Sequence, residues 1–310
     1  MTLAGSSPSR PTLSGVAAVL LAAACWGASG IFVKLIMADG VISSLCLAFW
    51  RDTAAFAGFI VLALSMYRSR ISIRPSDWPR LAGMGISLGA FHVALNLGYR
   101  LNGAAITTIQ QAAMPAIVLL VARIIWKEPL SGLKIFSLVL IGIGTVLVSG
   151  IVRADTPDVT AVGILMGFLI PGLYASWSLF GKSLRTGYSA VVTLTWAFGM
   201  AAVILLPFQL YTGSILPPSI SAISLLWFGG LTGISTVFAF FAFTFALGRL
   251  PAGIASILVM SEIAFAVFYA HIVLNETLAG WEIIGALVVV GGVIILLAPG
   301  VKKKPTAVRP

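Results

Sequence analysis

The sequence predicts an all-α integral membrane protein with ten transmembrane helices in two inverted five-helix repeats and both termini in the cytoplasm. The first observation behind this prediction is composition: 59% of the 310 residues are hydrophobic, 9% are charged, and the mean hydropathy is +1.08. A soluble domain carries about 25% charged residues, whereas a membrane-spanning helix needs about 20 mostly apolar residues. The other two observations are the placement of the basic residues and an internal repeat.

Apolar runs that are bounded by charges, prolines or loop residues give the ten predicted helices. In the first half the runs are 14–34, 41–66, 80–100, 104–124 and 134–152, with Lys34, Arg68, Arg100, Arg123 and Arg153 at or near their ends. In the second half they are 160–181, 189–211, 221–247, 252–273 and 280–298, with Lys182, Thr212, Gly248, Asn275 and Pro299 just after them. The connections are short, so any function has to be built between helices.

Basic residues gather in the loops that this helix order places on the cytoplasmic side. With the N-terminus inside, fifteen of the nineteen Lys and Arg residues fall in cytoplasmic segments, Lys34, Arg100 and Arg153 fall outside, and Arg51 lies within a helix. Cytoplasmic loops of membrane proteins carry such an excess. The net charge of +10 therefore indicates topology and not nucleic-acid binding. The basic tail at 299–310 is expected to meet anionic lipid head groups.

The chain is similar to itself when it is shifted by 148 residues. "WGASGIFVK" (26–34) then aligns with "YASWSLFGK" (174–182), and "KEPLSG" (127–132) aligns with "NETLAG" (275–280). Five helices per repeat is an odd number, so the second copy enters the membrane from the opposite side. Inverted repeats with a binding site between them are typical of secondary carriers that work by alternating access. The predicted units are a tail at 1–13, repeats at 14–152 and 153–298, and a tail at 299–310.

Three ionisable residues lie at bilayer depth. Arg51 and Asp52 fall within the second predicted helix, and Glu262 falls within the ninth. A charged side chain in the membrane is costly unless it faces protein or water and finds a partner. We predict that Arg51 pairs with Glu262, with Asp52, or with both. This group is either a structural clamp between the halves or a part of the site that senses substrate or exchanges a proton.

Polar and aromatic residues inside the predicted helices are the candidates for a substrate-binding site. His92, Asn96 and Tyr99 have the spacing of one helix face. Pro115 removes a backbone hydrogen bond from its helix. Two glutamines precede this proline, and their amides are costly to leave unsatisfied in a membrane. The remaining candidates complete the set: Gln110, Gln111, Tyr174, Trp177, Ser256, Met260 and Trp26. Trp26 and Tyr174 are repeat equivalents, so they are either aromatic walls or gates above and below a planar ligand or residues of the packed core.

The features together resemble the EamA-type branch of the drug/metabolite transporter superfamily. The resemblance is carried by Arg51 in the second helix, "SEIAF" at 261–265 in the ninth, and the Glu-containing turns at 127–132 and 275–280, which precede Gly-rich helices. Within that branch the sequence is most similar to YddG-type exporters of aromatic amino acids. One departure is that the family's ninth helix commonly reads Glu-Pro, whereas Ile263 follows Glu262 here and the proline stands at 115 in the fourth helix.

The resemblance implies a secondary transporter of the bacterial inner membrane that exports aromatic and other amino acids or similar metabolites. The resemblance implies that the protein needs no cofactor, binds no metal and catalyses no reaction. The partners that it implies for the protein are a small-molecule substrate and the lipid bilayer. The glycines of the fifth and tenth helices permit close helix packing. Whether these helices also form a homodimer contact stays open.

Three other functions are weighed against this interpretation. A drug or nucleotide-sugar carrier of the same superfamily is the nearest, although nucleotide phosphates call for several inward-facing bases and Arg51 is alone in the helices. A channel should line its pore with rings of like groups. An intramembrane serine protease could use Ser29 of "GASG" with His271 as its base. The sequence offers no metal-ligand spacing and no Walker-type loop.

Overall fold

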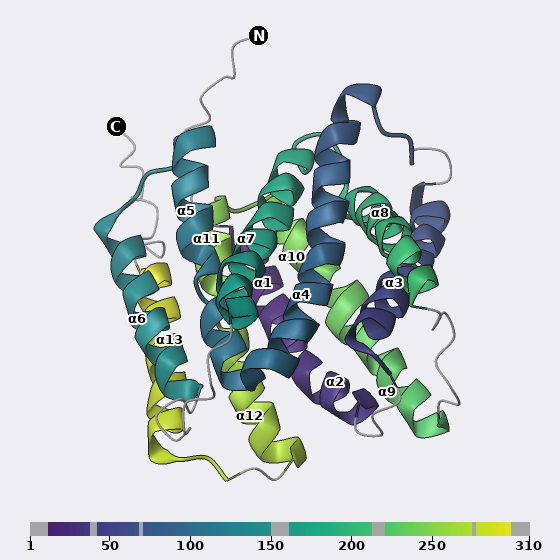
Figure 1. Cartoon of the computed structure of the whole chain (residues 1–310). Helices are drawn as coiled ribbons and strands as arrows, with labels where there is room; N and C mark the ends of the chain where they lie inside the picture. Colours follow the sequence, from purple (N-terminus) through teal and green to yellow (C-terminus); the bar gives the residue numbers. More distant parts are fainter. Residues whose placement is uncertain are drawn as a thin grey trace, which may run out of the picture.

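The computed structural model describes residues 12–37, 42–67, 71–149, 161–212, 221–274 and 277–298, and all regular secondary structure in these ranges is helical (Figure 1). In this part of the chain, eight helical segments are long and apolar enough to cross a membrane, and Gly132–Val148 is a shorter apolar helix. The chain is therefore an integral membrane protein. The total of ten spans and the cytoplasmic termini stay predictions, and the two tails lie almost wholly outside the described residues.

The helices follow one another with few intervening residues. The first half holds α1 (Leu13–Gly27), α2 (Ser29–Met37), α3 (Ser44–Tyr67), the 3-10 turn η1 (Pro75–Asp77), α4 (Trp78–Gln111), α5 (Met114–Ile125) and α6 (Gly132–Val148). The second half holds α7 (Ala161–Leu184), α8 (Ala190–Tyr211), α9 (Ala222–Thr232), the π-helix η2 (Gly233–Phe238), α10 (Ala239–Leu247), α11 (Ala252–Val259), α12 (Glu262–Leu274) and α13 (Gly280–Leu297).

Ser and Thr side chains begin several of these helices. The hydroxyl groups of Thr12, Ser131, Ser189 and Ser221 each accept a hydrogen bond from the backbone N–H three residues later, at 3.1 to 3.3 Å. The first N–H groups of a helix have no partner within it, so such a cap satisfies one of them. In a membrane protein this fixes where α1, α6, α8 and α9 leave the connecting loops.

Three of the predicted helices are interrupted, and the sequence indicated only the interruption beside Pro115. The α-helical backbone breaks at Ala28, at Ala112–Ala113 and at Met260–Ser261. The last two breaks are 148 residues apart, which is the offset of the internal repeat. Pro115 explains the first of these two, because its nitrogen carries no hydrogen. No proline follows the other, where the Ser261 hydroxyl instead donates to the Leu258 carbonyl oxygen at 2.9 Å.

The connection predicted between 100 and 104 takes an unexpected form. The backbone is helical throughout α4, yet a methyl group placed on Gly98 would lie 3.1 Å from Thr107 Cγ2. Nine residues of straight helix span about 13.5 Å, so α4 turns back on itself between these two residues. Both of its arms contact α7, the first where Gly83 meets Phe180 and the second where Gln110 donates to Gly163 O.

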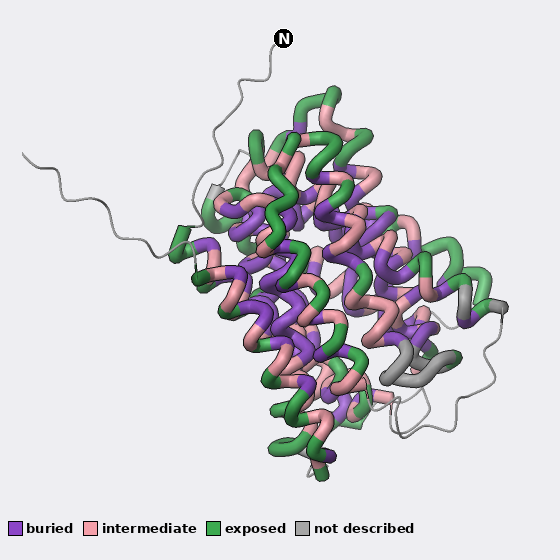
Figure 2. The backbone as a smooth tube through the Cα atoms, turned by 90° about the vertical axis from the view of Figure 1, so that its left-hand side faces the viewer, coloured by how far each residue is buried: buried purple, intermediate pink, exposed green. Residues whose placement is uncertain are grey.

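Helices of the two halves interleave. α4 packs against α7 and α8, α3 packs against α8, α1 packs against α10 and α12, and α6 packs against α13. Figure 2 shows that buried and exposed residues alternate along most helices. The exposed side chains include large apolar ones such as Phe168, Ile124 and Leu287. An exposed apolar surface of this kind suits lipid and agrees with a membrane-embedded bundle.

Glycines bring α6 and α13 into backbone contact, as the sequence predicted. A methyl group placed on Gly144 would lie 2.7 Å from the Gly285 carbonyl oxygen, and one placed on Gly285 would lie 2.7 Å from Gly144 O. Gly292 similarly faces α6, whereas a methyl group placed on Gly142 or Gly291 would have no described neighbouring atom within 4 Å. The close approach therefore rests on a subset of the predicted glycines, and Gly150 lies outside the described residues.

Candidate substrate-binding cavity

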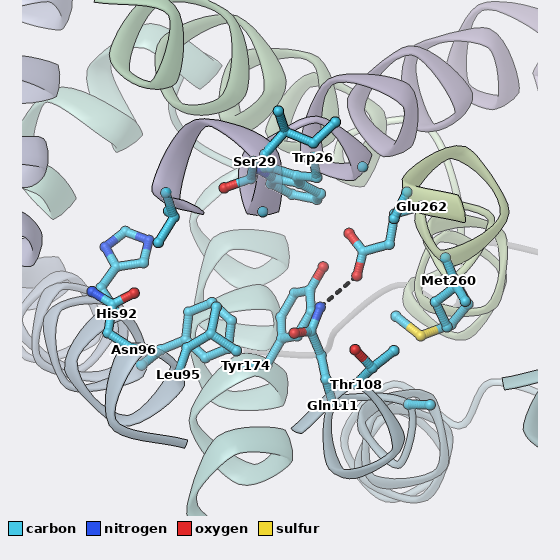
Figure 3. A pocket seen from close by; sticks show the side chains of 18 of the residues that line it. Trp26, Ser29, His92, Leu95, Asn96, Thr108, Gln111, Tyr174, Met260 and Glu262 are labelled. Atoms are coloured by element: carbon cyan, nitrogen blue, oxygen red, sulfur yellow. Dashed lines mark hydrogen bonds between the residues drawn. The ribbon is translucent and has the colours of Figure 1, made fainter. Parts of the chain in front are cut away.

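A cavity of about 470 Å³ lies between the two halves, beside the helix interruptions (Figure 3). Its walls come from α1, α2, α3, α4, α7, α10 and the junction of α11 with α12. Gly30 and Lys34, which line it, are exposed, whereas Tyr174, Trp177 and Phe240 are at most 2% exposed. The cavity therefore reaches the surface beside α2 and ends on buried aromatic rings. Its volume is in the range of small-molecule sites.

Aromatic side chains from three helices form one contiguous cluster against the cavity. The rings of Tyr174 and Trp177 stack on each other, with centroids 5.6 Å apart, and Phe240 lies 5.0 Å from Trp177 and 4.9 Å from Trp26. Trp26 also contacts Tyr174 edge to face at 6.3 Å. The alternative in which these two repeat equivalents lie on opposite sides of a ligand is therefore wrong. They meet each other, because both lie where the two halves pack together.

Glu262 and Gln111 join the two helix interruptions. Gln111 is the last residue of α4 and Glu262 is the first residue of α12. The Gln111 amide donates from Nε2 to Glu262 Oε1 at 2.5 Å, and both residues line the cavity (Figure 3). Glu262 also lies at the N-terminal end of its helix, where the backbone dipole favours negative charge. Gly27 makes room for this junction, because a methyl group there would lie 3.0 Å from Glu262 O.

His92 is positioned by a buried carboxylate. His92 Nδ1 lies 2.6 Å from Asp52 Oδ1, and the side chains are 1% and 0% exposed. An ionised Asp52 can only accept, and in that state the hydrogen of this contact lies on His92 Nδ1. His92 lines the cavity, and its Nε2 has no hydrogen-bond partner among the described residues. The indole Nε1 of Trp177 is buried in the same unsatisfied state there.

Arg51 lines the cavity, but its contacts differ from the predicted ones. Its Nε donates to Thr236 Oγ1 at 2.8 Å, and a terminal nitrogen lies 3.5 Å from Ser235 O. Among the described residues, no ion pair joins it to Glu262 or Asp52, so the expected pairing is corrected. The reason is η2: a π-helical turn is wider than an α-turn and leaves carbonyl groups accessible, and Arg51 packs against this turn.

Several predicted site residues do not reach the cavity. Gln110 faces α7 and donates to Gly163 O at 3.2 Å, and the buried Ser256 hydroxyl donates to Gly253 O at 3.0 Å. Pro115 is buried near the start of α5, and Asp52 contacts His92 without lining the cavity itself. The side chain of Tyr99 lies outside the described part of the chain. The cavity lining does include the predicted Trp26, His92, Asn96, Gln111, Tyr174, Trp177 and Met260.

Other lining residues were missed by sequence reasoning. Phe91 and Leu95 flank the polar stripe of α4, and Thr108 lies one turn before Gln111. The spacing from the predicted residues could have indicated these three. Phe240 lies in an apolar run in which no residue stands out. The sequence places Lys34 among the basic residues outside the membrane, and in the structure Lys34 lines the open end of the cavity.

The residues that would form a serine protease are not brought together. Ser29 lines the cavity at the start of α2, whereas His271 is exposed in the last turn of α12. No hydrogen bond between them occurs within the described ranges. In the same ranges, no group of three or more His, Cys, Asp or Glu side chains could hold a metal ion.

Comparisons with known proteins agree with this architecture. The sequence model of the EamA-like transporter family matches the chain twice, at residues 13–150 and 161–298. An uncharacterized transporter of Archaeoglobus fulgidus is 23% identical over 273 residues, which cover 88% of this chain and 94% of the relative. The uncharacterized inner membrane transporter YicL of Salmonella typhimurium is 26% identical over 297 residues, which cover 92% of this chain and 95% of the relative. A solved crystal structure superposes with a TM-score of 0.76 at 18% identity, covering 93% of this chain and 99% of that chain.

Proposed function

Because the chain belongs to the EamA-like transporter family, we propose that it is a secondary carrier that exports aromatic and other amino acids from a bacterial cytoplasm across the inner membrane. Two inverted repeats would expose the cavity to each side in turn. The family and the named relatives are transporters, which implies a small-molecule substrate and a lipid bilayer as partners.

One observation carries the choice of substrate class. The cavity combines an aromatic wall with two side chains of opposite charge, Glu262 and Arg51. A mostly apolar lining with a few placed polar or charged groups is typical of small-molecule sites. A ligand with an aromatic ring, a cationic group and an anionic group would suit this lining. Free aromatic amino acids have this chemistry.

Charged groups on different helices suit the two ends of such a molecule. Glu262 and Arg51 both line the cavity, and they are not paired with each other in the described structure. The ammonium group of an α-amino acid would bind at Glu262, and the carboxylate would face the side of Arg51. The ring would lie against Trp26, Tyr174 and Trp177.

A carrier of nucleotide sugars is the second candidate. The observation that favours it is Lys34, a second base on the cavity wall. Lys34 lies at the exposed end, however, and Arg51 is already bonded to Thr236. Two phosphate groups would therefore meet little inward-facing positive charge, and the amino acid is the better match.

Counterflow in proteoliposomes tests this proposal. Vesicles are loaded with unlabelled tryptophan, phenylalanine, threonine or a nucleotide sugar, and entry of the matching radiolabel is followed without an ion gradient. We expect transient accumulation with tryptophan and phenylalanine and none in protein-free vesicles. Accumulation with the nucleotide sugar alone would overturn the substrate class, and a linear, non-accumulating leak would indicate a channel.

A further inference from the structure

The Glu262 carboxyl group is a buried acid that has no basic partner among the described residues. It is 7% exposed and lines the cavity, and its hydrogen bond comes from the neutral amide of Gln111. No Lys, Arg or His of the described residues forms an ion pair with it. Figure 3 shows the carboxyl group facing the cavity across from His92 and Asn96. Its environment is therefore ready to accept a positive charge that enters through the cavity.

The nearby bases are committed elsewhere or lie at the surface. Arg51 donates to Thr236 on η2, His92 is held by Asp52, and Lys34 lines the exposed end. Together with Glu262 these are the ionisable groups from α2, α3, α4 and α12 at the cavity. None of the three bases is arranged in the described structure to neutralise Glu262.

In the described part of the chain, the ionisable groups on the other helices that pack against α12 form no ion pair with Glu262. Cys25 lies on α1, one residue before Trp26. Lys134 of α6 donates from Nζ to Pro129 O at 2.9 Å, and Glu282 of α13 accepts from the Ala279 N–H at 2.7 Å. Tyr269 and the exposed His271 lie farther along α12 itself. The charge on Glu262 is thus set by what occupies the cavity.

We propose that Glu262 is a cation site that holds either a proton or the ammonium group of the substrate, and that this exchange couples export to proton entry. The inference rests on the proposed function, because it takes an amine-bearing substrate. An unpaired carboxylate in a membrane interior is costly, so the empty site takes a proton. The Gln111 amide can donate to either form of the acid.

The cycle balances in mass and charge. On the cytoplasmic side the substrate ammonium binds the Glu262 carboxylate, and the proton leaves Glu262 for cytoplasmic water. On the outer side the substrate departs, and a proton from that side binds the vacant carboxylate. A zwitterion has no net charge, so each cycle moves one amino acid outward and one proton, with one positive charge, inward. Both a pH gradient and an inside-negative potential should drive export.

The test compares wild type with Glu262→Gln in proteoliposomes. With the interior acidic and the exterior alkaline by about 1.5 pH units, wild type should accumulate tryptophan about tenfold or more over its equilibrium level. Glu262→Gln retains the hydrogen bond from Gln111 but cannot titrate. It should raise the KM for tryptophan in counterflow, because Glu262 binds the ammonium group, and it should lose accumulation driven by the pH gradient.

The outcomes separate this inference from the proposed function. Absence of tryptophan counterflow in wild type contradicts the proposed function itself. Counterflow without any response to the pH gradient in wild type, or a full response in Glu262→Gln, overturns the proton site and leaves the carrier standing.

A chemical readout needs no transport. Dicyclohexylcarbodiimide reacts with protonated carboxyl groups in apolar surroundings, so the peptide that contains Glu262 should be labelled in purified protein, less at high pH and less with tryptophan present. Glu128 is the internal control, because it accepts hydrogen bonds from the Ala252 and Gly253 N–H groups at 2.8 and 3.2 Å and lies 4.0 Å from Lys134 Nζ. Labelling of Glu262 that ignores both pH and tryptophan, or no labelling at any pH, would contradict the proposal.

Discussion

At the residue scale, two adjacent glutamines have different environments. Gln111 faces the cavity and donates to Glu262, whereas Gln110 faces α7 and donates to Gly163 O. In the sequence they were equivalent candidates, because both are amides at bilayer depth. Adjacent residues of a helix point about 100° apart, and the α4 interruption at Ala112–Ala113 lets Gln111, the last residue of α4, meet the first residue of α12. A break in a helix is decided by tertiary packing as well as by local sequence, so the sequence could not distinguish them.

This pair gives a matched experiment. Gln111→Leu should lower tryptophan counterflow by more than tenfold, since a hydrogen bond to a charged group contributes about 1.5–3 kcal/mol and each 1.4 kcal/mol is about a factor of ten. Gln110→Leu should keep the transport rate per folded molecule and lose only about 1 kcal/mol of stability. Counterflow of both variants at equal protein content measures this. Equal rates for the two variants would remove Gln111 from the site.

The carboxylate behind His92 gives a second prediction at this scale. The Asp52 carboxyl group lies 2.6 Å from His92 Nδ1 and holds the ring of His92 at the cavity wall. Asp52→Asn can donate to Nδ1 and so favours the opposite tautomer. We expect at least a tenfold rise in the KM for tryptophan with little change in thermal stability. An unchanged KM would show that the orientation of His92 has no part in substrate recognition.

At the element scale, the helix types and most of their bounds could be predicted, and of the interruptions only the one beside Pro115 could. Hydropathy reports how long an apolar run is, but it does not report where a helix breaks inside that run. The breaks at Ala28 and Met260–Ser261 carry no proline, and η2 differs from its neighbours only in hydrogen-bond spacing. Glycine-mediated packing of α6 against α13 could be predicted, because close helix approach in membranes needs small residues.

Two glycines of α6 provide a stability test. A methyl group on Gly144 would lie within 2.9 Å of three atoms of α13, two of them backbone, whereas Gly142 has no atom within 4 Å. Gly144→Ala should therefore destabilise the protein by about 1–3 kcal/mol, the usual cost of overpacking. Gly142→Ala should be neutral or stabilising by about 0.5–1 kcal/mol, because alanine favours the helix. Thermal unfolding in detergent compares the two, and a Gly144→Ala variant as stable as Gly142→Ala contradicts the described packing.

At the scale of the whole molecule, polar contacts between loops and helix ends close the cavity at the end that lies away from α2. The Lys182 ammonium donates to the Leu247 and Leu250 carbonyl oxygens at 2.8 and 2.5 Å, and the Glu128 carboxylate caps the start of α11. The predicted topology places these contacts on the cytoplasmic side. On that topology we expect the open end of the cavity, beside α2, to face the outside. Sequence alone indicated the repeat but could not indicate which side is open, because both conformations share one sequence.

Weakening this closure should change which side has access to the cavity. Glu128→Ala removes both hydrogen bonds to the N-terminal end of α11. We expect faster labelling, from the cytoplasmic side, of a cysteine introduced in place of Thr108, measured with an impermeant thiol reagent on inside-out vesicles in a Cys25→Ala, Cys46→Ala background. Lys127→Ala is the control, because it changes a neighbouring charge but keeps these bonds. Equal labelling rates in the two variants would show that Glu128 does not hold the cavity closed.

Protection of Thr108→Cys from a thiol reagent shows whether this cavity holds the transported amino acid. Thr108 lines the cavity beside Gln111, so in intact cells the cysteine should react with an impermeant thiol reagent added outside. Tryptophan should slow that reaction in a concentration-dependent way, and an equal concentration of sucrose should not. A labelling rate that tryptophan leaves unchanged, in a variant that still performs tryptophan counterflow, would place the substrate elsewhere and contradict the account.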